Sequence, residues 1–252
     1  MRKNLASIKR WIHALLTPVP LFGLIGLPRY VANWYTYQTE YGSKLRLSDS
    51  YPCLIDWVRS TPFDPHYFYQ AAWLARRIAI EKPLHHVDIG SDIRMINVIS
   101  GFVPTEFLDY RPLNVSLEGL VCKAGNLTSL AKDNESVASL SCLHVVEHIG
   151  LGRYGDAIDP DGSSKALNEL QRVLSPGGRL YLSVPVGREC VCFNAHRVFD
   201  PNTIAALLPK LTLIEFSLVD DQGFFHQHQS LELGGAQEYG CGLFIFEKLN
   251  DH

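Results

Sequence analysis

An apolar, strand-like run ends at Ile89 and is followed at once by Gly90-Ser91-Asp92, and this junction constrains the fold more than any other part of the chain. A glycine at the end of a strand lets the backbone turn sharply into a helix. Asp109 stands at the end of the next strand-like run, where an acidic side chain can bind ribose hydroxyls. The order of strand, tight turn and distal acid predicts a site for a nucleoside cofactor.

After Pro83 the chain alternates strand-like and helix-like segments, which is typical of a parallel sheet covered by helices on both faces. The clearest helix is expected at 163–174, because an apolar stripe runs between a small polar start and the stop Ser175-Pro176-Gly177-Gly178. We expect strands near 84–89, 105–109, 119–123, 137–143, 179–184, 211–218 and 241–247. The predicted fold class is therefore α/β, with a Rossmann-like, doubly wound sheet of seven strands.

The composition changes near residue 82, which predicts an N-terminal helical extension at 1–82 and a Rossmann-like domain at 83–249. The extension is rich in aromatic residues from Tyr30 onward, and such a density usually means packing. A helix is expected at 67–80, with Asp64-Pro65 as its start. Asp64, His66 and Tyr67 either belong only to that start or face the cofactor, and the sequence leaves both open.

The first residues carry Arg2, Lys3, Lys9 and Arg10 and an apolar stretch up to Leu27. Three prolines interrupt the stretch, so no continuous run reaches the roughly 20 residues that span a bilayer. A short helix at 4–16 is expected, with apolar residues at helical spacing. It either caps the core or makes peripheral membrane contact, as an interfacial helix does.

Composition excludes some partners. With a net charge of −3 the chain lacks the excess of basic residues that is typical of nucleic-acid-binding proteins.

The six cysteines lack the spacing of a secreted disulfide scaffold, which favours reduced thiols in a cytoplasmic protein. Cys190 and Cys192 are too close in sequence for a typical zinc knuckle, although a strand would put both thiols on one face. No metal site is predicted, and a metal pair of His144 and His148 is a minor alternative.

The positions after the first strand distinguish two cofactor classes. A dinucleotide site needs Gly-x-Gly-x-x-Gly, but here the three positions hold Gly90, Asp92 and Met95. The Asp92 carboxylate would repel a pyrophosphate, whereas S-adenosyl-L-methionine carries a positive sulfonium and a positive amino group. The sequence therefore favours the methyl donor, and an NAD-dependent oxidoreductase ranks last.

Four segments carry a resemblance: the Asp-Ile-Gly-Ser run, Lys123-Ala124-Gly125-Asn126-Leu127, Leu143-His144-Val145-Val146-Glu147-His148, and Leu174-Ser175-Pro176-Gly177-Gly178. Together they resemble the class I S-adenosylmethionine-dependent methyltransferases, and within them an uncharacterised methyltransferase-like family with an Asp-Ile-Gly-Ser first motif. The resemblance implies that the last strand runs antiparallel. It also implies that Glu147 stabilises the helix that follows this His-x-x-Glu-His segment.

The resemblance implies the site residues as well. The cofactor-binding set is Asp88, Gly90, Ser91, Asp92, Asp109, Tyr110, Gly125, Asn126, Leu127 and Leu143, and the catalytic set is His144, His148 and His196. In this interpretation Asp109 binds the ribose and the Asn126 amide oxygen accepts from the adenine amino group. Three alternatives stay open: Asp88 as a turn or capping carboxylate, Asp109 paired with Arg111, and His196 as a surface imidazole.

These expectations combine into one predicted function. The chain is expected to transfer a methyl group from S-adenosyl-L-methionine to a small-molecule acceptor, with a saccharide or a lipid-linked molecule as the narrower expectation. The alternative is a non-catalytic module that keeps the fold for binding or assembly, because fold does not establish function.

Overall fold

The computed structural model describes residues 20–42 and 44–249. The chain forms two compact units, Met1–Pro62 and Phe63–His252. The helix that starts at Pro65 belongs to the second unit, and the domain boundary near residue 82 stays a prediction. The short helix expected at 4–16 lies outside the described residues.

The N-terminal unit contains helix α2 (Pro20–Tyr41) and the short 3-10 helix η1 (Leu47–Asp49). The helix continues through Pro28. Gly26 lets α2 approach the segment after η1, since a Cβ at this position would lie only 2.0 Å from the carbonyl oxygen of Leu54. The Tyr30 hydroxyl and the Ser50 Oγ, 2.8 Å apart, join the same two segments. Among the helices in the described part, none combines the length and apolar character that crossing a membrane requires.

The aromatic residues of this unit do not all pack as their density suggested. Tyr35 is 66% exposed and Trp57 is 81% exposed. The guanidinium of Arg29 lies over the Trp57 ring, 4.7 Å from its centroid. Cation–π contacts of this kind hold an indole at a surface without burying it.

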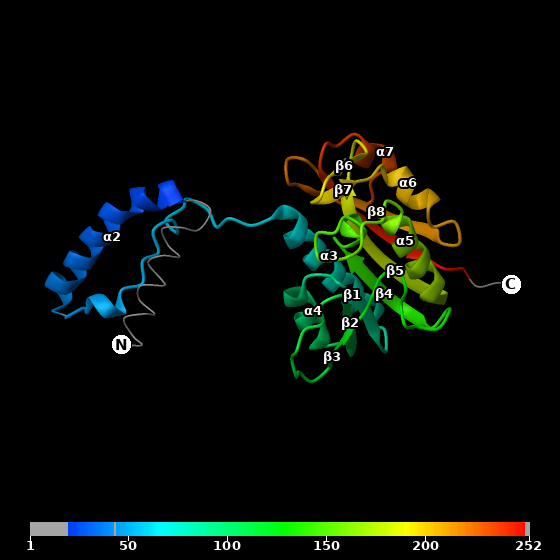
Figure 1. Ribbon diagram of the computed structural model, residues 1–252, viewed down its shortest axis with the longest axis horizontal. Coiled ribbons are helices and arrows are strands. Elements are labelled where there is room, and N and C mark those ends of the chain that lie inside the picture. Colours follow the sequence, from blue (N-terminus) through cyan, green and yellow to red (C-terminus); the bar gives the residue numbers. More distant parts are fainter. Residues whose placement is uncertain (1–19, 43, 250–252) are drawn as a thin grey trace. The chain divides into compact units, whose positions relative to one another are not determined.

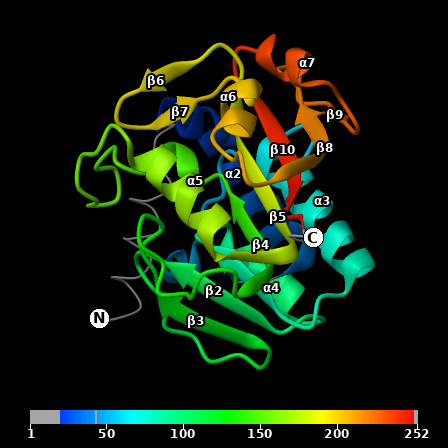
Figure 2. The ribbon, with the colours of Figure 1, turned by 90° about the vertical axis from the view of Figure 1, so that its right-hand side faces the viewer.

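The second unit is built on an eight-stranded sheet with the order β3-β2-β1-β4-β5-β10-β8-β9. Figures 1 and 2 together label its strands. Its strands are β1 (His86–Ile89), β2 (Thr105–Asp109), β3 (Leu120–Ala124), β4 (Val137–Leu143), β5 (Leu174–Val186), β8 (Thr212–Val219), β9 (Phe225–His226) and β10 (Gly240–Glu247). Strands β1 to β5 are parallel, and β10 lies antiparallel between β5 and β8. All seven expected strands form, but the expected count was wrong because β9 adds an eighth.

Helices cover both faces of this sheet. Figures 1 and 2 show α3 (Pro65–Glu81) and α4 (Ile93–Ser100) on one face and α5 (Gly162–Val173) and α6 (Pro201–Ala206) on the other. Each face has its own apolar core: Trp73, Leu74 and Ile96 belong to the first, and Leu167, Leu170 and Ile204 to the second. This arrangement confirms the doubly wound α/β prediction.

Three smaller elements complete the unit. The strands β6 (Cys190–Cys192) and β7 (His196–Val198) form a separate hairpin, α7 (Leu231–Gly235) precedes β10, and the 3-10 helix η2 (Val146–His148) follows β4. The 3-10 helix η2 lies within the His-x-x-Glu-His segment, and the next helix along the chain is α5.

Local sequence explains where the helices begin. The Asp64 carboxylate accepts the backbone N–H groups of His66 and Tyr67 at 2.9 and 3.3 Å, which caps α3 as predicted. The loop before α5 is held by an acidic side chain. Asp156 accepts from the N–H groups of Gly150 and Tyr154, so it holds a loop and does not cap the helix.

Candidate functional site

A cavity of about 320 Å³ opens at the carboxyl ends of the parallel strands β1, β2 and β4. Ligand crevices in open α/β sheets lie at this edge, and the volume is within the range of small-molecule pockets. The lining residues are Ile89, Gly90, Leu108, Asp109, Tyr110, Arg111, Gly125, Asn126, Leu127, Thr128, His144, Val145, His148, Ile149, Gly150, Tyr154, Asp156, Ala157 and Asp159.

The cavity brings together most of the predicted site residues. Gly90, Asp109, Tyr110, Gly125, Asn126, Leu127, His144 and His148 line it. The predicted residues that do not line it are Asp88, Ser91, Asp92, Leu143 and His196. Only the first group is placed to contact a molecule in the cavity directly.

Gly90 makes the turn that opens the cavity. Its φ is +68°, in the left-handed region that favours glycine, and its N–H donates to the Leu108 carbonyl at 2.8 Å. A Cβ at this position would lie 3.2 Å from Cγ1 of Val145 and 3.8 Å from the Asp109 carboxylate. The absence of a side chain therefore keeps both the backbone turn and the space beside Asp109.

A buried hydrogen-bond network joins Asp88, Ser91 and Leu143. The Ser91 Oγ–H and N–H donate to the Asp88 carboxylate at 2.6 and 3.0 Å, and the Leu143 N–H donates to the Ser91 Oγ at 3.0 Å. This network connects the turn after β1 to the end of β4. Burial raises the pKa of Asp88 to about 6, against the opposing effect of its hydrogen bonds from Ser141 and Ser91. Asp88 therefore matches the alternative of a turn carboxylate.

The hydrogen-bond network of Asp88 extends through Ser141 to the buried His86. The Ser141 hydroxyl donates to Asp88, so it accepts from the Nε2–H of His86, 2.8 Å away, while Nδ1 of His86 accepts from the Ser139 hydroxyl at 2.8 Å. Burial lowers the pKa of His86 to about 3. A neutral imidazole thus links β1 to β4 under the site.

Asp92 does not line the cavity. Its carboxylate accepts the N–H of Arg94 at 2.9 Å and forms an ion pair with the Arg94 guanidinium, which together cap α4. The hydrogen bond from the Arg94 side chain lowers the pKa of Asp92. The carboxylate therefore does not occupy the position where it would crowd a ligand.

Asp109 lines the cavity at the end of β2, and one of its oxygens accepts the N–H of Arg111 at 2.6 Å. The Arg111 guanidinium lies over the ring of Tyr154, 4.5 Å from the centroid. Within the described residues no ion pair joins Arg111 to Asp109. The carboxylate is therefore available to a ligand, against the alternative of a structural ion pair.

Asn126 follows Gly125 in the turn after β3. Its amide oxygen already accepts from the N–H and the Oγ–H of Thr128, at 3.0 and 2.9 Å. The group that remains for a ligand is its amide NH₂, a donor, so the expected acceptance from an adenine amino group does not match this geometry. Gly125 is required by close packing, since a Cβ there would lie 2.9 Å from Cβ of Leu108.

His144 occupies the most constrained position of the site. Its φ is +54°, which few residues other than glycine adopt, and its buried Nδ1 lies 2.7 Å from Oε1 of the buried Glu147. Burial alone would lower the pKa of His144, but Cys241 and Glu147 raise it to about 10. Glu147 thus acts on His144, a role that the sequence analysis did not assign to it.

The other two predicted catalytic histidines differ in position. His148 lines the cavity, its Nδ1–H donates to the Ala195 carbonyl at 2.7 Å, and its Nε2 lies 3.7 Å from Oε1 of Glu147. His196 lies on β7 outside the cavity, with its ring 5.0 Å from that of Tyr239. Burial lowers the pKa of both imidazoles.

Three aromatic side chains surround His144 that sequence reasoning did not assign to the site. The rings of His66 and Tyr67 stack on it at 5.5 and 5.4 Å, and Tyr239 stacks on His66 at 5.2 Å. His66 and Tyr67 therefore lie beside His144, but neither lines the cavity, so whether they face a cofactor stays open. Tyr239 directly precedes the last strand, which pairs with β5. This position was the one sequence signal that could have placed Tyr239 near the site.

Comparison with known proteins gives a partial family match and a clear fold. A family model described as "Caenorhabditis protein of unknown function, DUF268" matches residues 120–233. A comparison with curated proteins gives no match.

Several solved structures have a similar fold. The [4+2]-cyclase SpnF is 12% identical, with 91% of this chain and 97% of SpnF covered and a TM-score of 0.54. The YcgJ protein of Bacillus subtilis is 13% identical, with 73% and 100% covered and a TM-score of 0.51. The N-methyltransferase NodS of Bradyrhizobium japonicum, solved with S-adenosylhomocysteine, is 16% identical, with 85% and 99% covered and a TM-score of 0.50.

At these identities the likeness shows the fold and not the reaction. The sheet order, the antiparallel β10 and the helices on both faces agree with it. The second unit of this chain has the Rossmann-like fold of the class I S-adenosylmethionine-dependent methyltransferases.

Proposed function

We propose that the protein binds S-adenosyl-L-methionine in the cavity at the carboxyl edge of the sheet and transfers its methyl group to a small molecule. The observation that carries the proposal is the unpaired Asp109 carboxylate at the end of β2, lining a cavity that the Gly90 turn keeps open. A carboxylate in this place accepts both hydroxyls of a ribose.

The lining residues suit the parts of this molecule. Asp109 accepts the ribose hydroxyls through charge-assisted hydrogen bonds, each worth roughly 1.5–3 kcal/mol. Leu127 gives an apolar wall and the Asn126 NH₂ donates to a ring nitrogen of the adenine. When bound, S-adenosyl-L-methionine supplies an electrophilic methyl group on a sulfonium.

His148 is the best placed of the predicted histidines to accept a proton from the acceptor molecule. It lines the cavity, its Nδ1–H donates to the Ala195 carbonyl, and its Nε2 lies 3.7 Å from Oε1 of Glu147, the carboxylate that can accept the proton once Nε2 has taken it up. A pKa below its ordinary value keeps this imidazole neutral at neutral pH. His196 lies outside the cavity and belongs to the region where an acceptor would enter.

The alternative function is that the protein has the methyltransferase fold but does not transfer a methyl group. SpnF, a [4+2]-cyclase, has this fold, so the fold alone does not fix the reaction. Binding of the cofactor to this chain decides between the proposal and a non-catalytic module. The narrower proposals are a saccharide or lipid-linked acceptor and a reducing, cytoplasmic compartment, which the six free cysteines support.

Calorimetric titration of the full chain with S-adenosylhomocysteine and, separately, with NAD⁺ tests the proposal. We expect micromolar binding of the first and none of the second. Binding would justify a screen of acceptors that starts with saccharides and lipid-linked molecules and measures S-adenosylhomocysteine release. A folded protein that binds neither compound would contradict the proposal and favour the non-catalytic module.

A further inference from the structure

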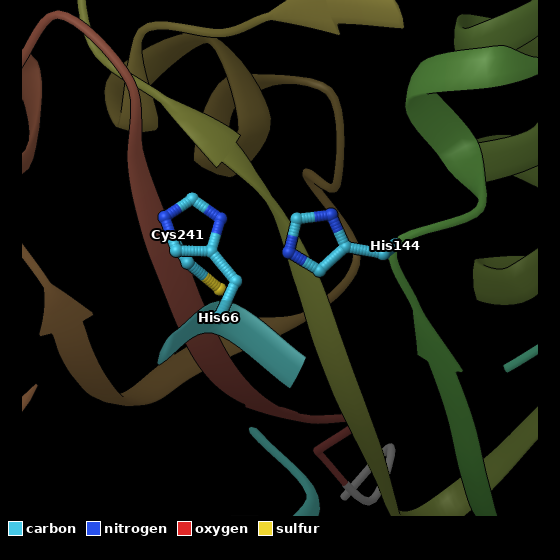
Figure 3. A group of neighbouring side chains, drawn as sticks. All are labelled: His66, His144 and Cys241. Carbon is cyan, nitrogen blue, oxygen red and sulfur yellow. The ribbon is translucent and has the colours of Figure 1, made fainter. Parts of the chain in front are cut away.

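Three metal-binding side chains meet beside the cavity. His66 comes from the first turn of α3, His144 follows β4, and Cys241 lies on β10. One ligand atom of each lies within 4.8 Å of the others. Figure 3 shows the three side chains directed toward one another, although they are far apart in the sequence. We propose that His66, His144 and Cys241 bind a zinc ion.

The strongest observation is the state of His144. Its side chain is 4% exposed and its Nδ1 pairs with Glu147, yet within the described part of the chain its Nε2 has no hydrogen-bond partner. A buried polar atom without a partner is costly and needs an explanation. A metal ion at Nε2 supplies that partner.

Glu147 prepares His144 for this role. A carboxylate that accepts Nδ1–H keeps that proton on Nδ1 and increases the basicity of the ring, so Nε2 is the nitrogen that gives up its proton when a metal ion binds. Histidines that bind zinc almost always carry such a carboxylate, carbonyl or water on the other nitrogen. The pair of His144 and Glu147, 2.7 Å apart and buried, reproduces that second shell before any metal is bound.

The donor set favours zinc. Two imidazoles and one thiolate are the ligands that zinc accepts, with Zn–N bonds of about 2.0–2.1 Å and Zn–S bonds of about 2.3 Å. Ligand atoms in such a tetrahedron are about 3.5 Å apart. Binding therefore draws the three atoms together by about 1 Å, through rotation of the half-buried His66 side chain.

Three protein ligands leave one position for water or for an oxygen or sulfur atom of a substrate, as in catalytic zinc sites. The rings of Tyr67 and Tyr239, which are 40% and 43% exposed, stand next to the cluster. His144 also lines the cofactor cavity, so the metal would lie at its edge. This inference goes beyond the proposed function, because metal binding is measured without cofactor or acceptor.

Metal analysis of the purified full chain tests the inference. We expect one zinc per chain by inductively coupled plasma mass spectrometry after expression in zinc-supplemented medium. Replacement with Co²⁺ should give a thiolate-to-cobalt charge-transfer band and the visible bands of tetrahedral cobalt. A wild type that takes up neither zinc nor cobalt would overturn the proposal, and stoichiometric copper in place of zinc would overturn the choice of metal.

Variants locate the metal. His66→Ala, near the surface, and the buried Cys241→Ala should each lose the zinc, and Glu147→Gln should bind it about 10- to 100-fold more weakly. If Cys241→Ala fails to fold, His66→Ala carries the test. Zinc retained at full affinity in a folded His66→Ala variant would contradict the site.

Two matched controls use the same residue types elsewhere. The exposed thiols of Cys190 and Cys192 are 4.0 Å apart and form the competing place for a soft metal. The double variant Cys190→Ser/Cys192→Ser and the variant His228→Ala, a histidine with a 70% exposed side chain, should both keep one zinc. Loss of zinc from the double variant alone would move the metal to the β6–β7 hairpin and overturn the proposal.

Discussion

Nδ1 of His144 lies 2.7 Å from Oε1 of Glu147, and both side chains are buried three residues apart in the turn that follows β4. The backbone at His144 adopts a positive φ to make this contact. Strain of this kind persists only where the surroundings hold it, and it gathers at functional sites. The pair therefore fixes the direction of the other ring nitrogen, which faces the cluster with His66 and Cys241.

Asp109→Ala should weaken the binding of S-adenosylhomocysteine about 10- to 150-fold for each ribose hydrogen bond that it removes, because each charge-assisted bond is worth roughly 1.5–3 kcal/mol. Calorimetric titration measures the dissociation constants. Asp133→Ala, which changes an exposed aspartate outside the cavity, should bind as the wild type does. Equal affinities in both variants would remove Asp109 from the cofactor site.

Gly90→Ala should destabilise the protein more than Gly155→Ala. Both glycines have a positive φ, +68° and +85°, so each substitution carries a left-handed strain of about 1–2 kcal/mol. At Gly90 the new Cβ also approaches Val145 at 3.2 Å, whereas at Gly155 it meets no heavy atom within 4 Å. Urea unfolding of the two variants measures the difference, and an equal loss in both would show that the contact with Val145 costs nothing.

Asp92→Gly should leave the affinity for S-adenosylhomocysteine unchanged within about twofold, because the carboxylate caps α4 and does not line the cavity. Stability should fall by only a few tenths of a kcal/mol, since glycine is itself an acceptable capping residue. Tighter binding by the variant would mean that the Asp92 side chain crowds the ligand after all.

His86 should make the protein sensitive to acid. Its pKa is lowered from 6.5 to about 3 in the folded protein, so the unfolded chain binds the proton first as the pH falls below 6.5. The free energy of unfolding then falls by up to about 1.4 kcal/mol per pH unit down to pH 3. Urea unfolding at pH 7 and 4.5 should show this loss in the wild type and a smaller one in His86→Gln.

The matched control for that series is His85→Gln, which changes the exposed neighbouring histidine. It should keep the acid sensitivity of the wild type. Because Asp88 is present in all three proteins, its own titration largely cancels when they are compared. Equal acid sensitivity in His86→Gln and the wild type would show that His86 is not the group responsible.

Much of the fold follows from local pattern. Strands β1 to β4 were predicted within about two residues, because each is a short apolar run between turn residues. The capped start of α3 was read from Asp64-Pro65. The two-residue β9 was missed, since Phe225-His226 carries no period and pairs only with the end of β8.

The candidate site was predictable only where its residues follow strands. Gly90 and Asp109 end neighbouring parallel strands, so the topology brings them together. The cluster of His66, His144 and Cys241 depends instead on α3 and β10 packing against the same edge, which no spacing in the sequence expresses. The direction of the Asp92 and Asn126 side chains depends on local hydrogen bonds to Arg94 and Thr128.

The most direct measurement is a crystal structure of the full chain with S-adenosylhomocysteine. The account predicts the nucleoside in the cavity at the carboxyl edge of the sheet, with both ribose hydroxyls within hydrogen-bond distance of the Asp109 carboxylate. A nucleoside bound elsewhere, or ribose hydroxyls that make no contact with Asp109, would contradict it.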